Sequence, residues 1–215
     1  MTRDKTISMK EQIINKSIRL FIDKGYNAST IKNITDAVSI TKGAFYWHFK
    51  SKNELLETIL NLYERTFTDT LIREVRGIEG TFLRKMKYTH KWVTEFAYHN
   101  RDFCVCYLTV LVEMAGSGTG IEEKTKKIYL KYLEFLKELT LLGKKEGYIR
   151  DNLDINIVAN AINAFHNGSL LEWHMNHNKI DGALFARTYG DILLYGMIKS
   201  GGQKKDNLVE PILTG

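Results

Sequence analysis

The chain has 215 residues, of which 44% are hydrophobic and 26% charged, and its formal net charge is +6. These values are typical of a folded globular protein and exclude a disordered chain, a collagen and a coiled-coil rod. The only proline is Pro211, and a long proline-free stretch favours long helices.

The positive charge is concentrated near the N-terminus. Residues 1–55 contain ten Lys and Arg against five Asp and Glu, a net +5, whereas residues 56–215 contain 21 against 20, a net +1. A basic segment joined to a near-neutral body indicates a polyanionic partner for that segment. Charge alone leaves open whether this partner is a nucleic acid or an anionic membrane surface.

Two cysteines, Cys104 and Cys106, are too few and too close for a disulfide framework, which favours a cytoplasmic location. Their spacing places the two thiols about 200° apart on a helix, so we interpret them as buried small residues rather than metal ligands. His166, His174 and His177 could bind a metal, and His174 and His177 are three residues apart, but no third ligand is evident. We predict no metal, no cofactor and, because no signal peptide or bilayer-length apolar run is present, no membrane anchor.

The first quarter of the chain predicts three short helices and the start of a long one. A polar arm over 1–8 precedes a helix from Met9 to Lys24, which Gly25 ends. Thr30 and Thr41 are placed to cap the second and third helices, and Ser51 with Glu54 forms a capping box for a helix reaching about Arg76. The second and third helices are joined by a minimal turn, which is helix-turn-helix spacing.

Five further helices are predicted in the body, over about 82–100, 102–115, 121–146, 154–176 and 181–200. No segment alternates in the way a strand requires. The predicted fold is therefore all-α with about nine helices. We divide it into a DNA-binding domain over 1–55, a helical domain over 56–200 and a disordered tail over 201–215.

The third helix, read as a recognition helix, offers side chains suited to DNA. Its first residues would lie nearest the bases, where Lys42 reaches a phosphate or a guanine edge and Gly43 allows the backbone to approach closely. Ala44 can touch a thymine methyl group. Phosphates can accept hydrogen bonds from the OH and NH groups of Tyr46, Trp47 and His48. The helix starts at Thr30 and Lys52 have free N–H groups, which also favour a phosphate. The alternatives are a packing role for Gly43 and ordinary surface positions for the polar residues.

The segment from Thr41 to Leu56 reads TKGAFYWHFKSKNELL and resembles the tetracycline-repressor (TetR) family, whose pattern there is roughly S/T-K-G-x-x-Y-x-H-F-x-S/T-K-x-x-L. Trp47 and Ile40 are mild departures from it. Phe45 and Phe49 are assigned to the core. The resemblance implies that the DNA-contact positions are Thr30, Thr41, Lys42, Gly43, Ala44, Tyr46, Trp47, His48 and Lys52.

The resemblance also implies that the body forms a homodimer and holds a small-molecule pocket. The last two predicted helices are apolar and rich in small residues, as a four-helix dimer interface would be, although an ordinary intrachain core fits them too. Glu113 in an apolar helix needs a partner, which a cationic ligand, a lysine or a capped helix end would supply. The candidate ligand contacts are Trp92, Phe96, Phe103, Tyr107, Glu113, Phe165, Asn167 and Trp173.

The prediction is a homodimeric transcriptional repressor that binds a near-palindromic double-stranded DNA operator and is released by a small molecule of unknown identity. One alternative is a DNA-binding protein of the same fold without such an effector. An enzyme is disfavoured, since the chain has no phosphate-binding loop, nucleophile elbow or metal set. A membrane-surface helix is disfavoured because residues 9–24 are amphipathic but not strongly cationic.

Overall fold

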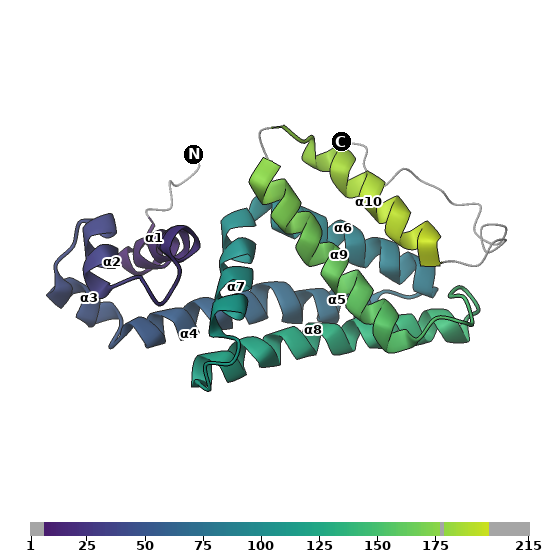
Figure 1. The fold of residues 1–215 in the computed structure, drawn as a ribbon, viewed down its shortest axis with the longest axis horizontal. Coiled ribbons are helices and arrows are strands. Elements are labelled where there is room, and N and C mark those ends of the chain that lie inside the picture. Colours follow the sequence, from purple (N-terminus) through teal and green to yellow (C-terminus); the bar gives the residue numbers. More distant parts are fainter. Residues whose placement is uncertain (1–6, 177–178, 198–215) are drawn as a thin grey trace. The chain divides into compact units, whose positions relative to one another are not determined.

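A computed structural model describes residues 7–176 and 179–197 (Figure 1). These residues form helices and contain no strand. The predicted arm, apart from Ile7 and Ser8, and the predicted tail over 201–215 lie outside the described residues. The helical elements are α1 (Met9–Lys24), α2 (Ile31–Val38), α3 (Lys42–His48), α4 (Lys52–Tyr63), the π-helical η1 (Glu64–Asp69), α5 (Thr70–Gly77), α6 (Phe82–His99), α7 (Arg101–Met114), α8 (Gly120–Lys145), α9 (Ile155–Asn176) and α10 (Gly182–Met197).

The segment α4–η1–α5 is the long helix predicted from Ser51 to about Arg76, with a six-residue π-helical stretch inside it. With this segment taken as one, the described residues contain nine helical stretches, which confirms the all-α prediction.

The predicted N-cap residues Thr30, Thr41 and Ser51 all cap helices in the structure, and only the capping box at Ser51 needs correction. Thr30 and Thr41 each accept a hydrogen bond from a backbone N–H three residues later, as N-caps do. Ser51 does the same with the Glu54 N–H at 3.1 Å. The Glu54 carboxylate, however, accepts from the Lys50 N–H at 2.7 Å instead of from Ser51, so the predicted reciprocal capping box is only half formed.

The turn between α2 and α3 is as short as predicted. Ser39 adopts the left-handed conformation, with φ 59° and ψ 47°, and the Ile40 N–H donates to the Thr35 carbonyl at 3.0 Å. This bond satisfies a carbonyl at the end of α2 and helps to close the turn. The left-handed residue is a serine, where glycine is usual, so the turn carries a small conformational cost.

By their contacts, the residues fall into two compact units, residues 1–65 with 102–128, and residues 66–101 with 129–215. The first unit contains α1 to α4 and α7, and the second contains α5, α6, α9 and α10. The predicted boundary between residues 55 and 56 falls within α4. The division into domains over 1–55 and 56–200 stays a prediction.

The core of the first unit is built from residues that the helical spacing selected. Phe45 and Phe49 are at most 1% exposed, which confirms their assignment to the core rather than to DNA contact. They share this core with Phe21, Ile34 and Leu55, each fully buried. Burying one such side chain stabilises the fold by about 1.5–3 kcal/mol, so three short helices hold together mainly through this shared centre.

The second unit has its own core, with α10 lying beside both α6 and α9. Phe82 is fully buried against Gly143, where an added Cβ would lie 2.7 Å from the Phe82 ring. Further aromatic side chains gather around Phe67, whose ring centroid lies 5.2 Å from that of Phe96 and 5.6 Å from that of Trp92. Closely packed aromatic rings of this kind fill space and stabilise helix contacts.

Cys104 and Cys106 are free and buried, and burial raises the pKa of each thiol to about 12. Both therefore remain neutral thiols in the core, as predicted. Among the described residues, none of the helices combines the length and the apolar composition needed to cross a bilayer.

Candidate DNA-binding site and effector cavity

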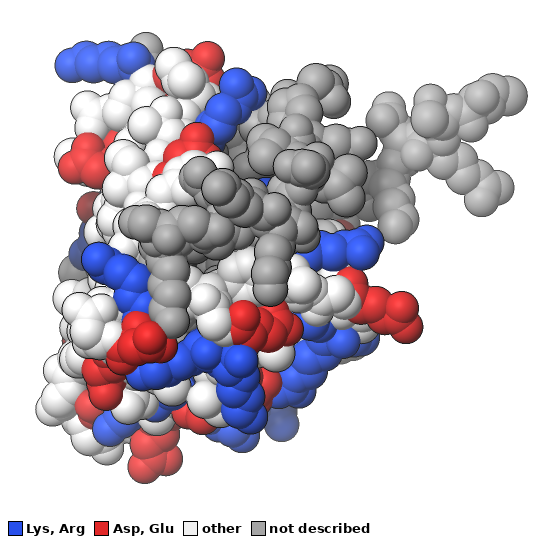
Figure 2. Space-filling model, turned by 90° about the vertical axis from the view of Figure 1, so that its right-hand side faces the viewer, with Lys and Arg blue, Asp and Glu red and all other residues white. Residues whose placement is uncertain are grey.

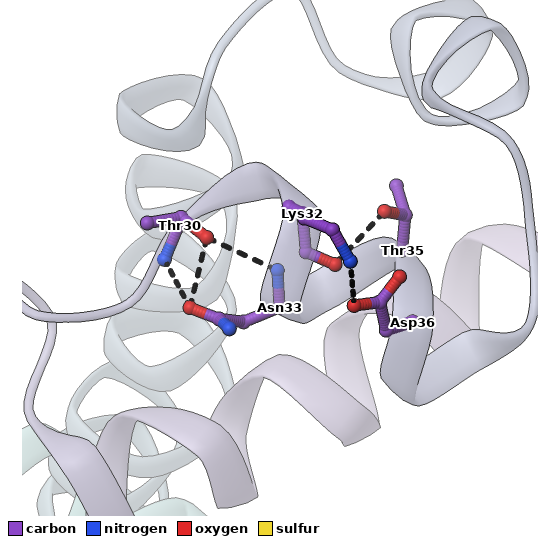
Figure 3. Close-up of polar contacts among 5 residues, drawn as sticks. All are labelled: Thr30, Lys32, Asn33, Thr35 and Asp36. Carbon is purple, nitrogen blue, oxygen red and sulfur yellow. Dashed lines mark hydrogen bonds and ion pairs between the residues drawn. The ribbon is translucent and has the colours of Figure 1, made fainter.

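Hydrogen bonds around Thr30 fix the start of α2 (Figure 3). The Thr30 hydroxyl accepts from the Asn33 N–H at 3.1 Å, and the Asn33 side-chain oxygen accepts from the Thr30 N–H at 3.0 Å. This capping box of Thr30 and Asn33 satisfies two N–H groups that a helix start leaves unpaired. Further along α2, Lys32 and Asp36 form an exposed ion pair at 2.6 Å. Thr30 itself is exposed, so its role in the cap leaves room for a partner at the same helix start.

Helix α3 buries one side and exposes the other. Phe45 is fully buried, whereas Tyr46 is 51% exposed and Trp47 is 85% exposed. Aromatic side chains this exposed contribute little to the fold, and their ring edges and polar groups are available to a partner. The other predicted contacts of this helix and its N-cap are exposed or partly exposed: Thr41, Lys42, Gly43, Ala44 and His48.

Gly43 is not required by the packing of this chain. A Cβ added there would have as its nearest contact the Thr41 hydroxyl oxygen at 3.7 Å, an ordinary van der Waals distance. Glycine inside a helix costs about 1 kcal/mol relative to alanine. Because packing within the chain gives no reason for this loss of stability, we interpret Gly43 as a position that the DNA backbone or bases approach closely.

Lys52, predicted as a phosphate contact, donates its hydrogen bonds inside the chain. Its ammonium lies 2.8 Å from the Tyr26 carbonyl oxygen and 2.7 Å from that of Ser29, and 4.2 Å from the centre of the Tyr26 ring. Burial lowers the pKa of this ammonium, and the charge of Glu113 partly offsets the shift. The geometry assigns Lys52 to holding the loop between α1 and α2, and its phosphate contact stays a prediction.

Glu113 binds the same loop from α7. Its two carboxylate oxygens accept from the N–H groups of Tyr26 and Asn27, each at 2.7 Å. The loop can approach so closely because Gly25 has φ +81° and no side chain, and a Cβ there would lie 3.3 Å from both carboxylate oxygens. Of the partners that the sequence left open for Glu113, the structure supplies backbone N–H groups just after the end of α1.

The phenol of Tyr26 completes this loop. Its hydroxyl donates to the Asn53 side-chain oxygen in the first turn of α4. Burial raises the pKa of Tyr26 to about 12, with further contributions from Glu113 and Glu57, so the hydroxyl stays protonated and remains a donor. We call the set of Tyr26, Lys52, Asn53 and Glu113 the loop clasp. It joins α7 and the first turn of α4 to the loop that precedes α2.

The second unit contains a cavity of about 280 Å³ that is formed by α6, α9 and α10. Its lining is mainly apolar and aromatic and includes Tyr98, Trp173, Phe185 and Tyr189. An apolar cavity with few polar groups is the usual form of a small-molecule site, although this volume is at the small end of the known range. Two of the three lining helices, α6 and α9, were expected to line the pocket. Helix α10 was expected only at a dimer interface.

Among the predicted ligand contacts, Trp173 lines this cavity. Trp92 and Phe96 stack on each other with ring centroids 5.1 Å apart and pack on Phe67. Phe165 lies outside the lining, with its ring 5.5 Å from that of Tyr189.

The other four predicted ligand contacts have partners within their own units. The Asn167 amide donates to the Asn163 side chain at 3.3 Å. Phe103 and Tyr107 pack against Tyr63 in the first unit, and Glu113 belongs to the loop clasp.

Sequence reasoning missed a buried polar residue of the cavity. His166 was considered only as a metal ligand, yet it lines the cavity, and the residue is 6% exposed. A histidine within the apolar face of a helix was the available signal. Its partner lies 34 residues away on α8, and such pairing cannot be read from local spacing.

Helices α9 and α10 also leave apolar side chains uncovered within this chain. Exposure is 77% for Met175, 68% for Ile157 and 60% for Ile192. Leu171, Leu184 and Tyr195 are each 46–59% exposed. So many large apolar groups on two neighbouring helices indicate a surface that another protein covers.

The chain resembles known proteins over most of its length. The uncharacterized HTH-type transcriptional regulator YerO of Bacillus subtilis (strain 168) is 29% identical over 198 residues, which are 89% of this chain and 66% of that protein. Among solved structures, the MbdR regulator from Azoarcus sp. CIB matches with a TM-score of 0.81 and 24% identity, over 89% of this chain and 100% of that one.

Two further solved structures hold acyl thioesters. FadR from Bacillus subtilis, in complex with stearoyl-CoA, matches with a TM-score of 0.68 and 20% identity, over 86% of this chain and 98% of that one. AibR, in complex with isovaleryl coenzyme A and operator DNA, matches with a TM-score of 0.71 and 19% identity, over 87% and 98%. At these identities the likeness shows a shared fold.

An exposed recognition helix, joined to the preceding helix by the three residues 39–41 within described residues that form helices and no strand, is typical of a helix-turn-helix DNA-binding regulator. The family of bacterial regulatory proteins called tetR matches residues 13–59, and the C-terminal region of YsiA-like proteins matches residues 66–196. The chain belongs to the tetR family, which confirms the resemblance seen in Thr41 to Leu56. It is a homodimeric DNA-binding transcriptional regulator and not an enzyme.

Proposed function

We propose that this protein is a cytoplasmic repressor that binds a near-palindromic operator and leaves it when a small molecule occupies the cavity of the second unit. The observation that carries the proposal is the pairing, in one chain, of an exposed recognition helix with an apolar cavity in the body. A regulator of this fold without an effector is the alternative, and a tightly packed body would favour it. The cavity between α6, α9 and α10 speaks against that alternative.

The DNA contacts that we propose are centred on α3. Lys42, Gly43 and Ala44 would face base edges and the nearest phosphates, while Tyr46, Trp47 and His48 would contact the backbone on either side. Thr30 and Thr41 add helix starts, whose N–H groups favour phosphate. In a two-fold symmetric dimer the two α3 helices would enter major grooves about one DNA turn apart, roughly 34–36 Å, which requires a near-palindrome.

The effector class that we propose is an acyl thioester of coenzyme A. The C-terminal region is of the YsiA-like type, and two structural neighbours hold stearoyl-CoA and isovaleryl-CoA. The cavity lining supports the acyl half of such a ligand, because aromatic and aliphatic side chains exclude water from an alkyl chain. At about 280 Å³, this partly open cavity suits a short or medium acyl chain better than a long one.

Release from DNA follows from unequal binding to two states. The effector must prefer the state in which the α3 helices no longer match the operator, and a shift from 99:1 to 1:99 requires a preference of about 5.5 kcal/mol. The covalent route is short: α6 lines the cavity up to His99, α7 begins at Arg101, and Glu113 on α7 holds the loop before α2. A displacement of α7 would thus reach the DNA-binding helices through the loop clasp.

The test is an operator-release assay. Purified wild-type dimer is bound to a fluorescent duplex chosen by selection from random DNA, and fluorescence anisotropy is followed during titration with octanoyl-CoA. The expected result is release at micromolar octanoyl-CoA, with free coenzyme A as the inactive control. Stable operator binding that no acyl-CoA from four to sixteen carbons disturbs would refute the effector class while leaving DNA binding intact.

A further inference from the structure

One residue that lines the cavity has a buried polar atom without a partner in the part of the chain that the structure describes. His166 projects from α9 and is 6% exposed. Its Nδ1 lies 2.8 Å from the Tyr132 hydroxyl, but its Nε2 has no hydrogen-bond partner. Because an unpaired buried polar group lowers stability, such an atom in a cavity wall indicates that something else completes it.

The proton on the His166 ring can be placed from the hydrogen bonds. Tyr132 is buried, and its hydroxyl has the His166 Nδ1 as its hydrogen-bond partner. A buried phenol hydrogen needs an acceptor, so the Tyr132 hydroxyl donates and Nδ1 accepts. In a neutral imidazole whose Nδ1 accepts, the proton is on Nε2. The unpaired atom is therefore an N–H donor.

The surroundings keep this imidazole neutral. Burial, together with the neighbouring His90, lowers the pKa of His166 to about 3. His90 lies with its ring centroid 6.1 Å from that of His166, and it pairs its own Nε2 with the Ala186 carbonyl at 2.8 Å. At neutral pH His166 thus carries an uncharged N–H, which gains no ion-pair energy from a carboxylate and suits a neutral oxygen acceptor.

We infer that His166 Nε2–H is the polar recognition point of the cavity and donates a hydrogen bond to a carbonyl oxygen of an otherwise apolar ligand. The inference rests on the proposed effector role of the cavity. For an acyl thioester the acceptor is the thioester carbonyl, and for other ligands it is a ketone or ester oxygen. Tyr132 is a positioning residue, because its hydroxyl fixes the tautomer of His166 without lining the cavity.

The experiment compares two molecules of nearly equal shape, acetophenone and ethylbenzene, which differ in a carbonyl. Binding of each to the wild-type dimer is measured by isothermal titration calorimetry and by the side-chain ¹⁵N resonances of histidine. We expect acetophenone to bind about tenfold more tightly, since the hydrocarbon leaves the buried N–H unpaired. We also expect the His166 Nε2 to carry the proton before any ligand is added.

Three variants assign the preference to this residue. His166→Leu should lose the preference, whereas His166→Gln, whose amide nitrogen can occupy the place of Nε2, should retain most of it. His90→Leu is the matched control, because it removes a buried imidazole that does not line the cavity, and the preference should persist. Equal binding of the two molecules by the wild type, binding of neither, or an Nδ1-protonated His166 would each overturn the inference.

A second pair of ligands separates this inference from the proposed function. Octanoyl-CoA is compared with S-octyl-CoA, a thioether that lacks the carbonyl, in the operator-release assay. Release that needs about tenfold more thioether supports both proposals. Equal release by both supports the effector class and contradicts the role of His166. A preference for acetophenone, with no release by either CoA derivative, supports His166 and refutes the effector class.

Discussion

The DNA-binding helices and the cavity region use aromatic residues in opposite ways. In the first region the phenylalanines are buried and Trp47 is 85% exposed at the tip of α3, whereas in the second Trp173, Phe185 and Tyr189 line an internal space. Net charge differs too, since residues 1–55 carry +5 and residues 56–215 carry +1. On the face of the molecule drawn in Figure 2, Lys and Arg are mixed with Asp and Glu. The first arrangement suits an external polyanion, and the second suits a partner that is largely apolar.

This contrast is tested most strongly by replacing one buried and one exposed aromatic residue of α3 with alanine, each in a separate variant. Phe45→Ala should cost about 3–5 kcal/mol and abolish operator binding, because it leaves a cavity in a small core. Trp47→Ala should leave stability within about 0.5 kcal/mol and still weaken operator binding. Urea unfolding and anisotropy titrations measure the two quantities. A large stability loss in Trp47→Ala would show that the indole has a structural role instead.

The cavity region should show its own dependence on pH. The pKa of His166 is lowered to about 3 in the folded state, whereas histidine in an unfolded chain titrates near 6.5. Between these values the unfolded chain binds more protons, so stability should fall by on the order of a few kcal/mol as pH drops from 6.5 towards 3. His166→Gln should flatten this dependence in urea unfolding at stepped pH. Parallel curves for variant and wild type would contradict the burial of a neutral imidazole.

The loop clasp should couple stability to DNA binding. Glu113→Ala removes two hydrogen bonds to a carboxylate and leaves the N–H groups of Tyr26 and Asn27 unpaired, at a cost of about 2 kcal/mol. Operator affinity should fall although Glu113 lies on α7 and is not among the proposed DNA contacts. The exposed Glu123→Ala, on α8, is the matched control. Unchanged operator affinity in Glu113→Ala would separate the loop from DNA recognition.

Two lysines of the DNA-binding helices should differ in the salt dependence of operator binding. Lys42→Ala should reduce the slope of log K against log salt by about one, because it removes a cation that meets phosphate. Lys52→Ala should lower stability and leave the slope unchanged, since its ammonium is directed at backbone carbonyls. A slope reduced by about one in Lys52→Ala would support the direct phosphate contact that was predicted from the sequence.

The smallest effect is expected at Gly43. Gly43→Ala should raise the stability of α3 by up to about 1 kcal/mol, because nothing in the chain obstructs the new methyl group. Operator affinity should nevertheless decrease if DNA approaches the helix closely there. Thermal unfolding and anisotropy on the same preparation measure the two effects. Higher stability with unchanged affinity would remove Gly43 from the proposed contacts.

Local signals explain why the DNA-binding helices were predictable and the cavity was not. Thr30 and Thr41 cap the helices that follow them, and Gly25 ends α1, so each boundary depends on a few adjacent residues. The partners of Lys52, Glu113 and His166 are 23 to 87 residues distant along the chain. Spacing on a helix identifies the residues that share a face, but not what covers that face. Trp92 was therefore predicted to line a pocket, whereas in the structure its ring stacks on that of Phe96.

The role of α3 as the recognition helix is tested most directly by selecting bound duplexes from random DNA with the wild-type dimer and measuring their binding at 50 and 200 mM salt. We expect a near-palindrome with half-sites about one DNA turn apart, and an affinity that falls steeply with salt. We also expect Trp47→Ala and Lys42→Ala each to weaken binding to the selected duplex. Recovery of no symmetric sequence, or binding unaffected by both substitutions, would contradict the assignment of α3 as the recognition helix.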